Sequence, residues 1–537
     1  MNAPETRSFF RRPKHLGPAA SAAVLLLFGA ILVWIQWRVG APGAAFGGFP
    51  DESAHYIGGV LMKEYIANGL FCDPVRYAVE YYSHTPFFAV GVWPPMYYLI
   101  EGIWMSVFGV GREAVLWLNV ISGAALAFLI FSIVRAHHGA VAGIAAGVMV
   151  LAMPAVQWSA CLVMVDLACT ALAIASLVFL ARYFDHPGWR NSLLFGLLAA
   201  VTVLTKNSAY YVLFVPAFLI LLRGQWRMLA QKSFWIAPIV FALLYGPWLL
   251  LSRRVLLLGI VGLPNFTPAD VAAGFIARLW NQNGILMLLA LPAVVAAFAR
   301  PRRTPTLELC LYSILFVLPF SIFLARVPVQ DRLLIAAGGA LAVASVASVR
   351  MILSGLRLPP RLFPLAVVLL AGGLFWKNAL RFPHPPRNEL RAIVATILKR
   401  DGPAPGSVLV PSRSEGPWIA EFVQLAGGGG RRTLIRPTKF LASESWNATH
   451  YEIRYSSLED LRSALSEVPF RYCIIDNYAL EYPHDRLLKA LLQSDSGQWR
   501  RVLSASRFTV YENAAWSPKS EEQVSAAMRR AALGLVR

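Results

Sequence analysis

The sequence predicts a mainly α-helical protein that crosses a membrane about eleven times and ends in an α/β domain outside the membrane. Of its 537 residues, 57% are hydrophobic and 15% are charged, whereas a soluble domain carries about 25% charged residues. Apolar runs long enough to cross a bilayer recur between residues 16 and 379, because a spanning helix needs roughly 20 apolar residues. From residue 380 onward the apolar runs are short and alternate with polar segments.

The first apolar run, 16–37, is too long for the hydrophobic core of a cleavable signal peptide, and it lacks the small-x-small pattern of a cleavage site at its end. We therefore expect an uncleaved anchor that holds residues 1–15 in the cytoplasm. The stretch 94–110 is ambiguous, because it is aromatic, short and contains Glu101. Ten further spans are expected near residues 113–134, 139–157, 161–181, 191–205, 208–222, 233–252, 283–299, 307–325, 333–349 and 361–379.

Loop charge decides where 94–110 lies, since cytoplasmic loops of membrane proteins are enriched in Lys and Arg. If this stretch does not span, one set of loops holds most of the basic residues: Arg135, Arg182, Arg190, Arg223, Arg227, Lys232, Arg300, Arg302, Arg303, Arg350, Arg357 and Arg361. We expect these loops to be cytoplasmic. Residues 39–112 then form one long external loop, in which 52–69 and 94–110 lie on the membrane as interfacial helices.

Residues 380–537 are expected to form a small external α/β domain. Strands are predicted at 408–410, 433–435, 473–475 and 508–510, and the capping-box pattern from Ser457 to Asp460 predicts the start of a helix. The glycines at 427–430 are not followed by the pattern of a phosphate loop, so they indicate a flexible turn.

The net charge of +20 is spread over short loops between apolar runs, which indicates membrane topology and no nucleic-acid partner. The five cysteines show neither metal-ligand spacing nor a disulfide framework. Cys161, Cys169 and Cys310 lie in apolar runs, where we expect them to be core residues. No cofactor is certain from the sequence, and a divalent metal is left open.

Two adjacent carboxylates, Asp51 and Glu52, follow Pro50 at the outer mouth of the first span. Acids after a proline often begin a helix, because the helix dipole favours negative charge there. Charges beside lipid are also costly and often functional. The expected topology brings further polar residues to the same outer side: His55, His84, Asp166, Lys206, Arg326, Asp331 and Arg332. Their shared side predicts one polar site at the outer rim.

Each of these residues also has a structural interpretation. Asp166 and Lys206 could form an ion pair, since buried charges are generally paired. Arg326 and Arg332 could anchor helix ends at the interface. His55 and His84 could be ordinary loop residues, and Tyr97 with Tyr98 fits an interfacial aromatic belt.

The chemistry that fits this set is transfer from a phosphate-linked lipid. Lys and Arg can bind the phosphate of a membrane-embedded polyprenyl phosphate, and a carboxylate can take the proton of an incoming hydroxyl. A sugar that leaves a lipid phosphate needs no nucleotide site, and the sequence shows none.

The pattern resembles the GT-C fold membrane glycosyltransferases, specifically the protein O-mannosyltransferase and aminoarabinose-transferase-like superfamily (family 39/83-like). The resemblance covers about residues 16–350, and the matching pieces are Pro50-Asp51-Glu52 with His55-Tyr56, Trp93-Pro94-Pro95-Met96-Tyr97-Tyr98, Met164-Val165-Asp166, Thr205-Lys206-Asn207 and Asp331-Arg332-Leu333-Leu334. Two positions depart from the family's pattern: Trp93 precedes Pro-Pro where His or Lys is frequent, and His55 lies four residues after Asp51 instead of three.

The resemblance implies that residues 16–379 form the catalytic domain and that 380–537 are a variable appendage. It implies inverting transfer of a sugar from a polyprenyl-phosphate donor to an acceptor hydroxyl at the outer face of the cell (inner) membrane. Asp51 would be the base, and Glu52 would orient the acceptor or tie down the loop. Lys206 and Arg332 would hold the donor phosphate, with Arg326 as a further phosphate candidate and His55, Asp166 and Tyr97 as further site candidates.

The sugar and the acceptor, which could be a lipid, a glycan or a protein, are left open. A transporter or flippase of lipid-linked sugars is the alternative function, although no internal repeat is visible and the charges gather at one rim. A membrane scaffold with an external binding domain would leave Asp51, Asp166 and Lys206 without a purpose.

Overall fold

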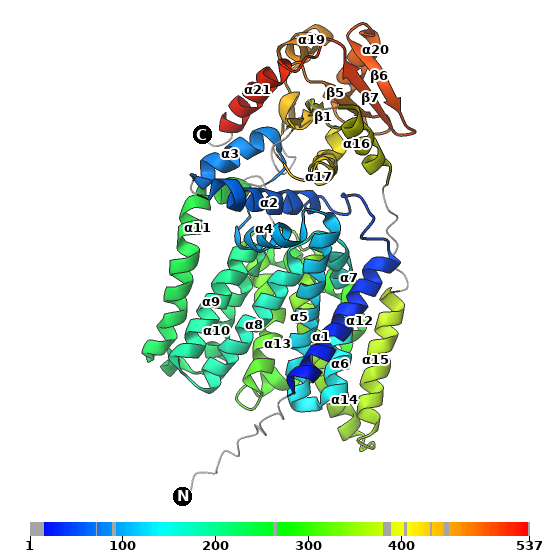
Figure 1. The fold of residues 1–537 in the computed structure, drawn as a ribbon. Helices are drawn as coiled ribbons and strands as arrows, with labels where there is room; N and C mark the ends of the chain where they lie inside the picture. The colour runs from blue at the N-terminus through cyan, green and yellow to red at the C-terminus, as the bar shows by residue number, and fades with distance from the viewer. Residues whose placement is uncertain are drawn as a thin grey trace, which may run out of the picture.

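The structure is a computed structural model, and Figure 1 shows a bundle of long helices with a smaller domain at one end. The predicted cytoplasmic segment 1–15 lies outside the part of the chain that the structure describes. This part comprises residues 16–70, 72–88, 93–260, 266–379, 388–401, 405–429, 432–444 and 451–534.

Within this part, eight helices are long and apolar enough to cross a membrane. They are α1 (Pro18–Arg38), α5 (Arg112–His138), α8 (Asp166–Asp185), α11 (Ile236–Ile260), α12 (Pro268–Ala299), α13 (Thr306–Leu324), α14 (Ile335–Gly355) and α15 (Leu362–Ala379). A ninth candidate is the pair α6 (Ala140–Leu151) and α7 (Pro154–Cys161), which is bent by 66°. With the shorter apolar helices α9 (Trp189–Thr205) and α10 (Tyr211–Arg223), these helices correspond to the eleven predicted runs.

One span begins earlier than predicted. The run at 283–299 is only the second half of α12, which starts at Pro268 behind a capping box formed by Thr267 and Asp270. The two halves meet at Asn283, whose φ of −142° is not helical. Polar residues in the first half hide it from a search for apolar runs.

Three helices of the first loop lie across one end of the bundle, between the bundle and the C-terminal domain (Figure 1): α2 (Glu52–Glu64), α3 (Pro74–His84) and α4 (Met96–Phe108). We call the end of the bundle that carries residues 39–111 the loop end. At about 1.5 Å per residue, the 13 residues of α4 reach roughly 20 Å, which is short of the roughly 30 Å hydrocarbon core. The ambiguous stretch therefore does not span.

Glycines let α2 and α4 pack closely. A Cβ atom on Gly59 would lie 2.5 Å from the carboxyl carbon of Glu101, and one on Gly102 would lie 2.7 Å from the backbone nitrogen of Lys63. Larger residues at these two positions would push the helices apart.

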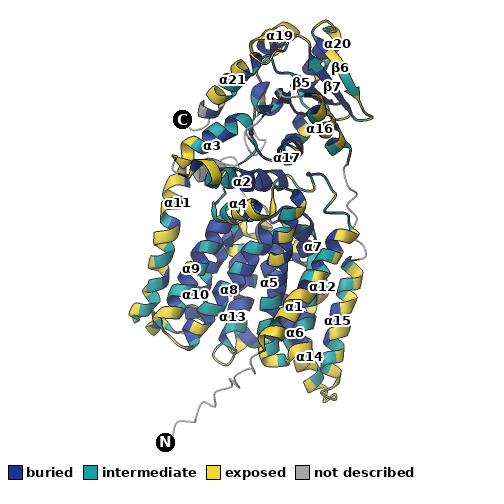
Figure 2. Cartoon of the chain, in the orientation of Figure 1, coloured by how far each residue is buried: buried dark blue, intermediate teal, exposed yellow. Residues whose placement is uncertain are grey.

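The basic loops gather at the opposite end of the bundle. There the Nε atom of Arg302 donates to the carbonyl oxygen of Arg223, and Arg350 donates to the carbonyl oxygen of His137. Figure 2 shows that the outward faces of the peripheral helices α1, α11 and α15 are exposed, whereas the inner helices are largely buried. This pattern, with exposed Leu26, Trp37 and Trp376, fits an integral membrane protein surrounded by lipid.

The C-terminal domain contains a five-stranded sheet in the order β2-β1-β5-β7-β6, in which β1 is parallel to both β2 and β5, and β7 is antiparallel to β5 and β6. The strands are β1 (Val408–Leu409), β2 (Leu434–Ile435), β5 (Tyr472–Asp476), β6 (Trp499–Ser504) and β7 (Phe508–Asn513), with a separate pair β3 (Ala442–Glu444) and β4 (Tyr451–Ile453). The four predicted strands are present, whereas β6, β3 and β4 were not predicted.

The helices of this domain are α16 (Asn388–Asp401), α17 (Glu415–Leu425), α18 (Pro437–Phe440), α19 (Leu458–Glu467), α20 (Pro483–Ser494) and α21 (Ser520–Gly534). Ser457 caps α19 as expected, because its side chain accepts from the backbone N–H of Asp460. The domain rests on the first loop, with α17 against α2 and α21 against α3 (Figure 1).

We predict that a thiol reagent distinguishes the two ends, since Cys72 in the first loop is exposed and the other four cysteines are buried. In sealed right-side-out membrane vesicles, a membrane-impermeant maleimide should label Cys72. A cysteine introduced as Arg303→Cys in a Cys72→Ser background should react only after the membrane is opened. Labelling in the reverse order would invert the topology.

Candidate active site

Four charged residues from distant parts of the sequence meet in two pairs at the loop end. Asp51 is the residue before the first turn of α2, and Arg332 lies in the 3-10 turn η5 (Asp331–Leu334) that leads into α14. Asp166 is the first residue of α8, and Lys206 directly follows α9. The structure thus places each of them at the end of a helix, where the chain leaves the apolar bundle.

The first pair joins Asp51 to Arg332. The Nη2 atom of Arg332 lies 2.6 Å from Oδ2 of Asp51, Nε donates to the side chain of Gln330 at 2.7 Å, and the guanidinium lies 4.5 Å from the ring centre of Phe49. The Nη1 atom is buried and has no hydrogen-bond partner among the described residues. Because 27% of the Asp51 side chain is exposed, a carboxylate that solvent can reach lies beside a cation with a free donor.

The second pair joins Asp166 to Lys206 at 2.6 Å, which is the ion pair that the structural interpretation expected. Asp166 begins α8, where the helix dipole favours its negative charge. Its Oδ2 atom is buried without a hydrogen-bond partner in the described part, and Lys206 is the more exposed partner. Each pair therefore leaves one buried polar atom unsatisfied.

His55 lies one turn after Asp51 on α2 and is enclosed by aromatic rings. Its Nδ1 atom is 2.8 Å from the hydroxyl of Tyr98, and its ring stacks on Trp93 with 4.5 Å between centroids. Burial lowers the pKa of His55 well below its usual range, and the charges of Lys206 and Arg332 lower it further. The imidazole is therefore neutral at pH 7, and its Nε2 atom has no hydrogen-bond partner among the described residues.

Tyr97 stands beside this group. Its ring centre is 6.2 Å from that of His55, and its hydroxyl donates to the carbonyl oxygen of Met164 at 3.4 Å. Tyr97 thus connects α4 to the segment that precedes Asp166.

Glu52 is fully buried and accepts five hydrogen bonds. Arg112 donates to it from Nε at 3.1 Å and from Nη2 at 2.8 Å, and the backbone N–H groups of Gly47, Gly48 and Val163 donate at 3.1, 3.1 and 3.2 Å. Both carboxylate oxygens are occupied. This geometry favours the loop-tying role for Glu52 over contact with an acceptor.

Arg326 is not brought into this group. It is exposed, and the part of the chain that the structure describes shows no ion pair or side-chain hydrogen bond for it. Its φ of 50° is left-handed, and its backbone closes the end of α13 by donating to Phe323. Its role in phosphate binding stays a prediction.

The structure adds residues to which the sequence analysis gave no role in the site. Arg112 directly precedes the predicted span 113–134, where it resembles an ordinary interfacial anchor. Trp93 and Tyr98 enclose His55. Glu101 is fully buried, and neither of its carboxyl oxygens has a hydrogen-bond partner in the described ranges. The sequence signal for Glu101 is an acid within an aromatic, apolar helix.

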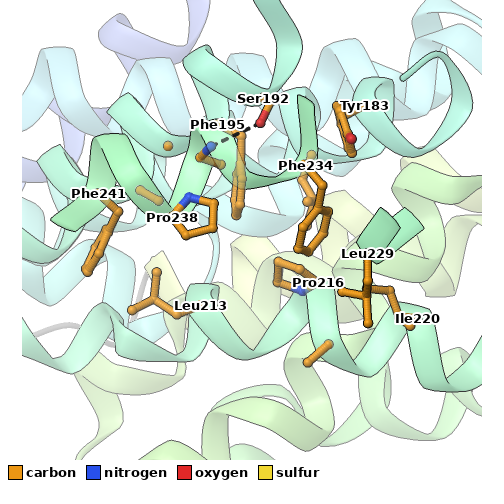
Figure 3. A pocket seen from close by; sticks show the side chains of 15 residues that line it. Tyr183, Ser192, Phe195, Leu213, Pro216, Ile220, Leu229, Phe234, Pro238 and Phe241 are labelled. Carbon is orange, nitrogen blue, oxygen red and sulfur yellow. Dashed lines mark hydrogen bonds between the residues drawn. The ribbon is translucent and has the colours of Figure 1, made fainter. Parts of the chain in front are cut away.

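Two other features bear on ligands. Among the described residues, no group of three or more His, Cys, Asp or Glu side chains could hold a metal ion. An apolar cavity of about 330 Å³ lies between α8, α9, α10 and α11. Figure 3 shows the aromatic and proline side chains that line it, such as Phe195, Pro216 and Phe241. None of the charged residues of the loop-end site lines it.

One protein-family model matches part of the chain. Residues 92–250, which include Trp93, Asp166 and Lys206, match a family model described as dolichyl-phosphate-mannose-protein mannosyltransferase. A search of the curated proteins finds no match.

Solved structures share the fold across most of the chain. One is ArnT from Cupriavidus metallidurans bound to undecaprenyl phosphate, with 12% identity, a TM-score of 0.59 and coverage of 92% of this chain and 98% of that one. The apo oligosaccharyltransferase from Archaeoglobus fulgidus has 12% identity, a TM-score of 0.58 and coverage of 93% and 75%. AglB from the same organism, in complex with an inhibitory peptide and a dolichol-phosphate, has 12% identity, a TM-score of 0.55 and coverage of 93% and 74%.

The fold is therefore that of the GT-C glycosyltransferases, which confirms the predicted fold class. The family model over residues 92–250 agrees with the predicted enzyme class, a membrane glycosyltransferase.

We predict that Glu52→Ala strongly destabilises the protein, because it leaves Arg112 buried and uncompensated. Breaking one side of a buried ion pair costs about 3–5 kcal/mol. Asp331→Ala is the matched control, since its pair with Arg278 is about half exposed on both sides and such pairs contribute about 0–1 kcal/mol. Equal melting temperatures for the two variants in detergent would contradict this assignment.

A second prediction concerns pH. Burial raises the pKa of Glu101 well above the usual 4.5, so the folded state keeps a proton that the unfolded state releases. Stability should fall as pH rises above 4.5, by up to about 1.4 kcal/mol per pH unit, until the raised pKa is passed. The Gln side chain of Glu101→Gln cannot titrate. The melting temperature of this variant, relative to that of the wild type, should therefore rise as the pH increases from 5 to 8. A constant difference would show that Glu101 is not buried as a neutral acid.

Proposed function

We propose that the chain transfers a sugar from a polyprenyl-phosphate-linked donor to an acceptor hydroxyl at the outer face of the cell (inner) membrane, with inversion. The observation that carries this proposal is the Asp51–Arg332 pair. A solvent-reachable carboxylate lies 2.6 Å from a guanidinium whose buried Nη1 atom has no partner among the described residues. The loop end and the C-terminal domain would then be extracytoplasmic.

On the donor side, Arg332 and Lys206 supply positive charge where the head group of a membrane lipid would lie. Arginine is well suited to phosphate, because its planar guanidinium can bind two oxygens at once. The structural relatives support this donor class, since one was solved with undecaprenyl phosphate and another with a dolichol-phosphate.

On the acceptor side, Asp51 is the proposed general base. As the acceptor oxygen bonds to the anomeric carbon, the bond from that carbon to the phosphate oxygen breaks and the acceptor proton passes to Asp51. The polyprenyl phosphate leaves with a charge that Arg332 and Lys206 stabilise. Donor phosphate would compete with Asp51 for Arg332, which frees the carboxylate when the donor is bound.

His55 and Asp166 complete the proposed site. The neutral imidazole of His55, one helical turn after Asp51, offers Nε2, and Asp166 offers its unsatisfied oxygen. These atoms could bind hydroxyl groups of the donor sugar or the acceptor.

We predict that Asp51→Asn leaves only a small residual rate of transfer in a folded protein. The amide keeps the shape of the side chain but cannot accept the proton, and general-base catalysis contributes about 10²- to 10⁴-fold. The measurement is transfer of radiolabelled sugar from a polyprenyl-phosphate donor to envelope fractions, with the melting temperature followed in parallel. Glu80→Gln, an exposed acid of the same loop, is the control and should keep wild-type activity. Wild-type rates in Asp51→Asn would remove Asp51 from the mechanism.

A further inference from the structure

The C-terminal domain contacts the first loop close to Asp51. Of its contacts with this loop, the one nearest to Asp51 in the sequence is made by Glu421 on α17 and Arg391 on α16, which we call the clamp pair. Glu421 is fully buried, and Nε of Arg391 lies 3.2 Å from its Oε2. A buried carboxylate is costly unless it is paired and hydrogen-bonded, so these two side chains depend on each other.

The clamp pair also binds three backbone groups of the first loop. Glu421 accepts from the N–H of Phe46 at 3.2 Å. Arg391 donates from Nη1 to the carbonyl oxygen of Gly43 at 3.0 Å and from Nη2 to that of Ala44 at 3.2 Å. Both carbonyl and N–H groups are held, so the path of residues 43–46 is fixed from the domain side.

The chain between Phe46 and Asp51 has little freedom to absorb a change in that path. Gly47 has a φ of 113°, and a Cβ atom on Gly48 would lie 2.2 Å from the side chain of Leu162. The N–H groups of both glycines are held by Glu52. Phe49 then packs under Arg332 at 4.5 Å and edge-on to Trp158 at 5.0 Å.

We infer that the C-terminal domain positions the proposed base: the clamp pair Glu421–Arg391 fixes residues 43–46 and thereby sets where Asp51 stands relative to Arg332. This inference rests on the proposed function of Asp51. It assigns Glu421 and Arg391 as positioning residues, because neither touches the reacting atoms. A displacement of the order of 1 Å at a reacting group can cost about 10²-fold in rate.

Three variants separate positioning from attachment of the domain. Arg391→Gln removes the charge and the bonds to Gly43 and Ala44. Arg391→Lys keeps a charge beside Glu421 but loses the planar fork that reaches both carbonyl oxygens. Arg432→Gln is the control, because Arg432 forms another buried ion pair of the same domain, with Asp401, and no contact of it with the first loop is recorded among the described residues.

The test uses the full-length protein and two measurements. Hydrogen exchange of peptides that cover residues 40–51 should rise in Arg391→Gln and Arg391→Lys and stay at the wild-type level in Arg432→Gln. Turnover should fall about tenfold or more in both Arg391 variants, with KM for the donor unchanged, because the donor phosphate site is left intact. In an Asp51→Asn background, Arg391→Gln should lower the residual rate no further.

Each outcome decides one claim. Unchanged exchange and unchanged turnover in a folded Arg391→Gln variant would overturn the inference, as would an equal loss of turnover in Arg432→Gln. An additional loss in the Asp51→Asn background would show that the clamp acts on something other than Asp51. If Asp51→Asn is fully active, the proposed function of Asp51 fails on its own, and the exchange data still report whether the domain holds the segment.

Discussion

The buried ion pair between Glu52 and Arg112 is the interaction on which the loop end depends. Both side chains are almost completely buried, with exposed fractions of 1% for Arg112 and 0% for Glu52. The carboxylate also accepts hydrogen bonds from three backbone N–H groups, which belong to two segments of the chain. This one side chain joins the start of α2, the start of α5 and the chain that leads into α8. Removing the charge from either partner would leave the other buried without compensation, so the loop can adopt only the path that keeps them together.

That constraint separates the roles of two adjacent acids. At the start of α2, Glu52 points into the protein and is saturated with donors, whereas Asp51 keeps part of its surface in solvent and meets Arg332. A buried acid with every lone pair engaged holds structure, and an accessible acid beside a cation can exchange partners. The proposed chemistry follows from this difference, because a base must release its partner when substrate arrives.

Much of the fold could be predicted, because apolar length and loop charge act locally and are visible in the sequence. The early start of α12 was missed, since its first half carries Asp270, Arg278 and Gln282. The predicted topology placed Asp51, His55, Asp166, Lys206 and Arg332 on one side of the membrane and left room for the pair of Asp166 with Lys206, but it did not indicate that Asp51 pairs with Arg332. The contact between Asp51 and Arg332 spans 281 positions, and the shielding of Glu52 depends on Arg112 and on the backbone at Val163. No local sequence pattern indicates such contacts, and none indicates the left-handed backbone at Arg326.

The central claim is that the loop-end charges bind a lipid phosphate, and native mass spectrometry of the purified protein tests it most directly. The protein would be titrated with a polyprenyl phosphate and, separately, with the matching polyprenol. We predict that the wild type binds the phosphate in preference to the alcohol. Arg332→Gln and Lys206→Met should each weaken phosphate binding about tenfold or more, since a charge-assisted contact contributes on the order of 1.5–3 kcal/mol, while melting temperatures show that both variants are folded. Equal binding of phosphate and alcohol, or unchanged affinity in both folded variants, would contradict the account.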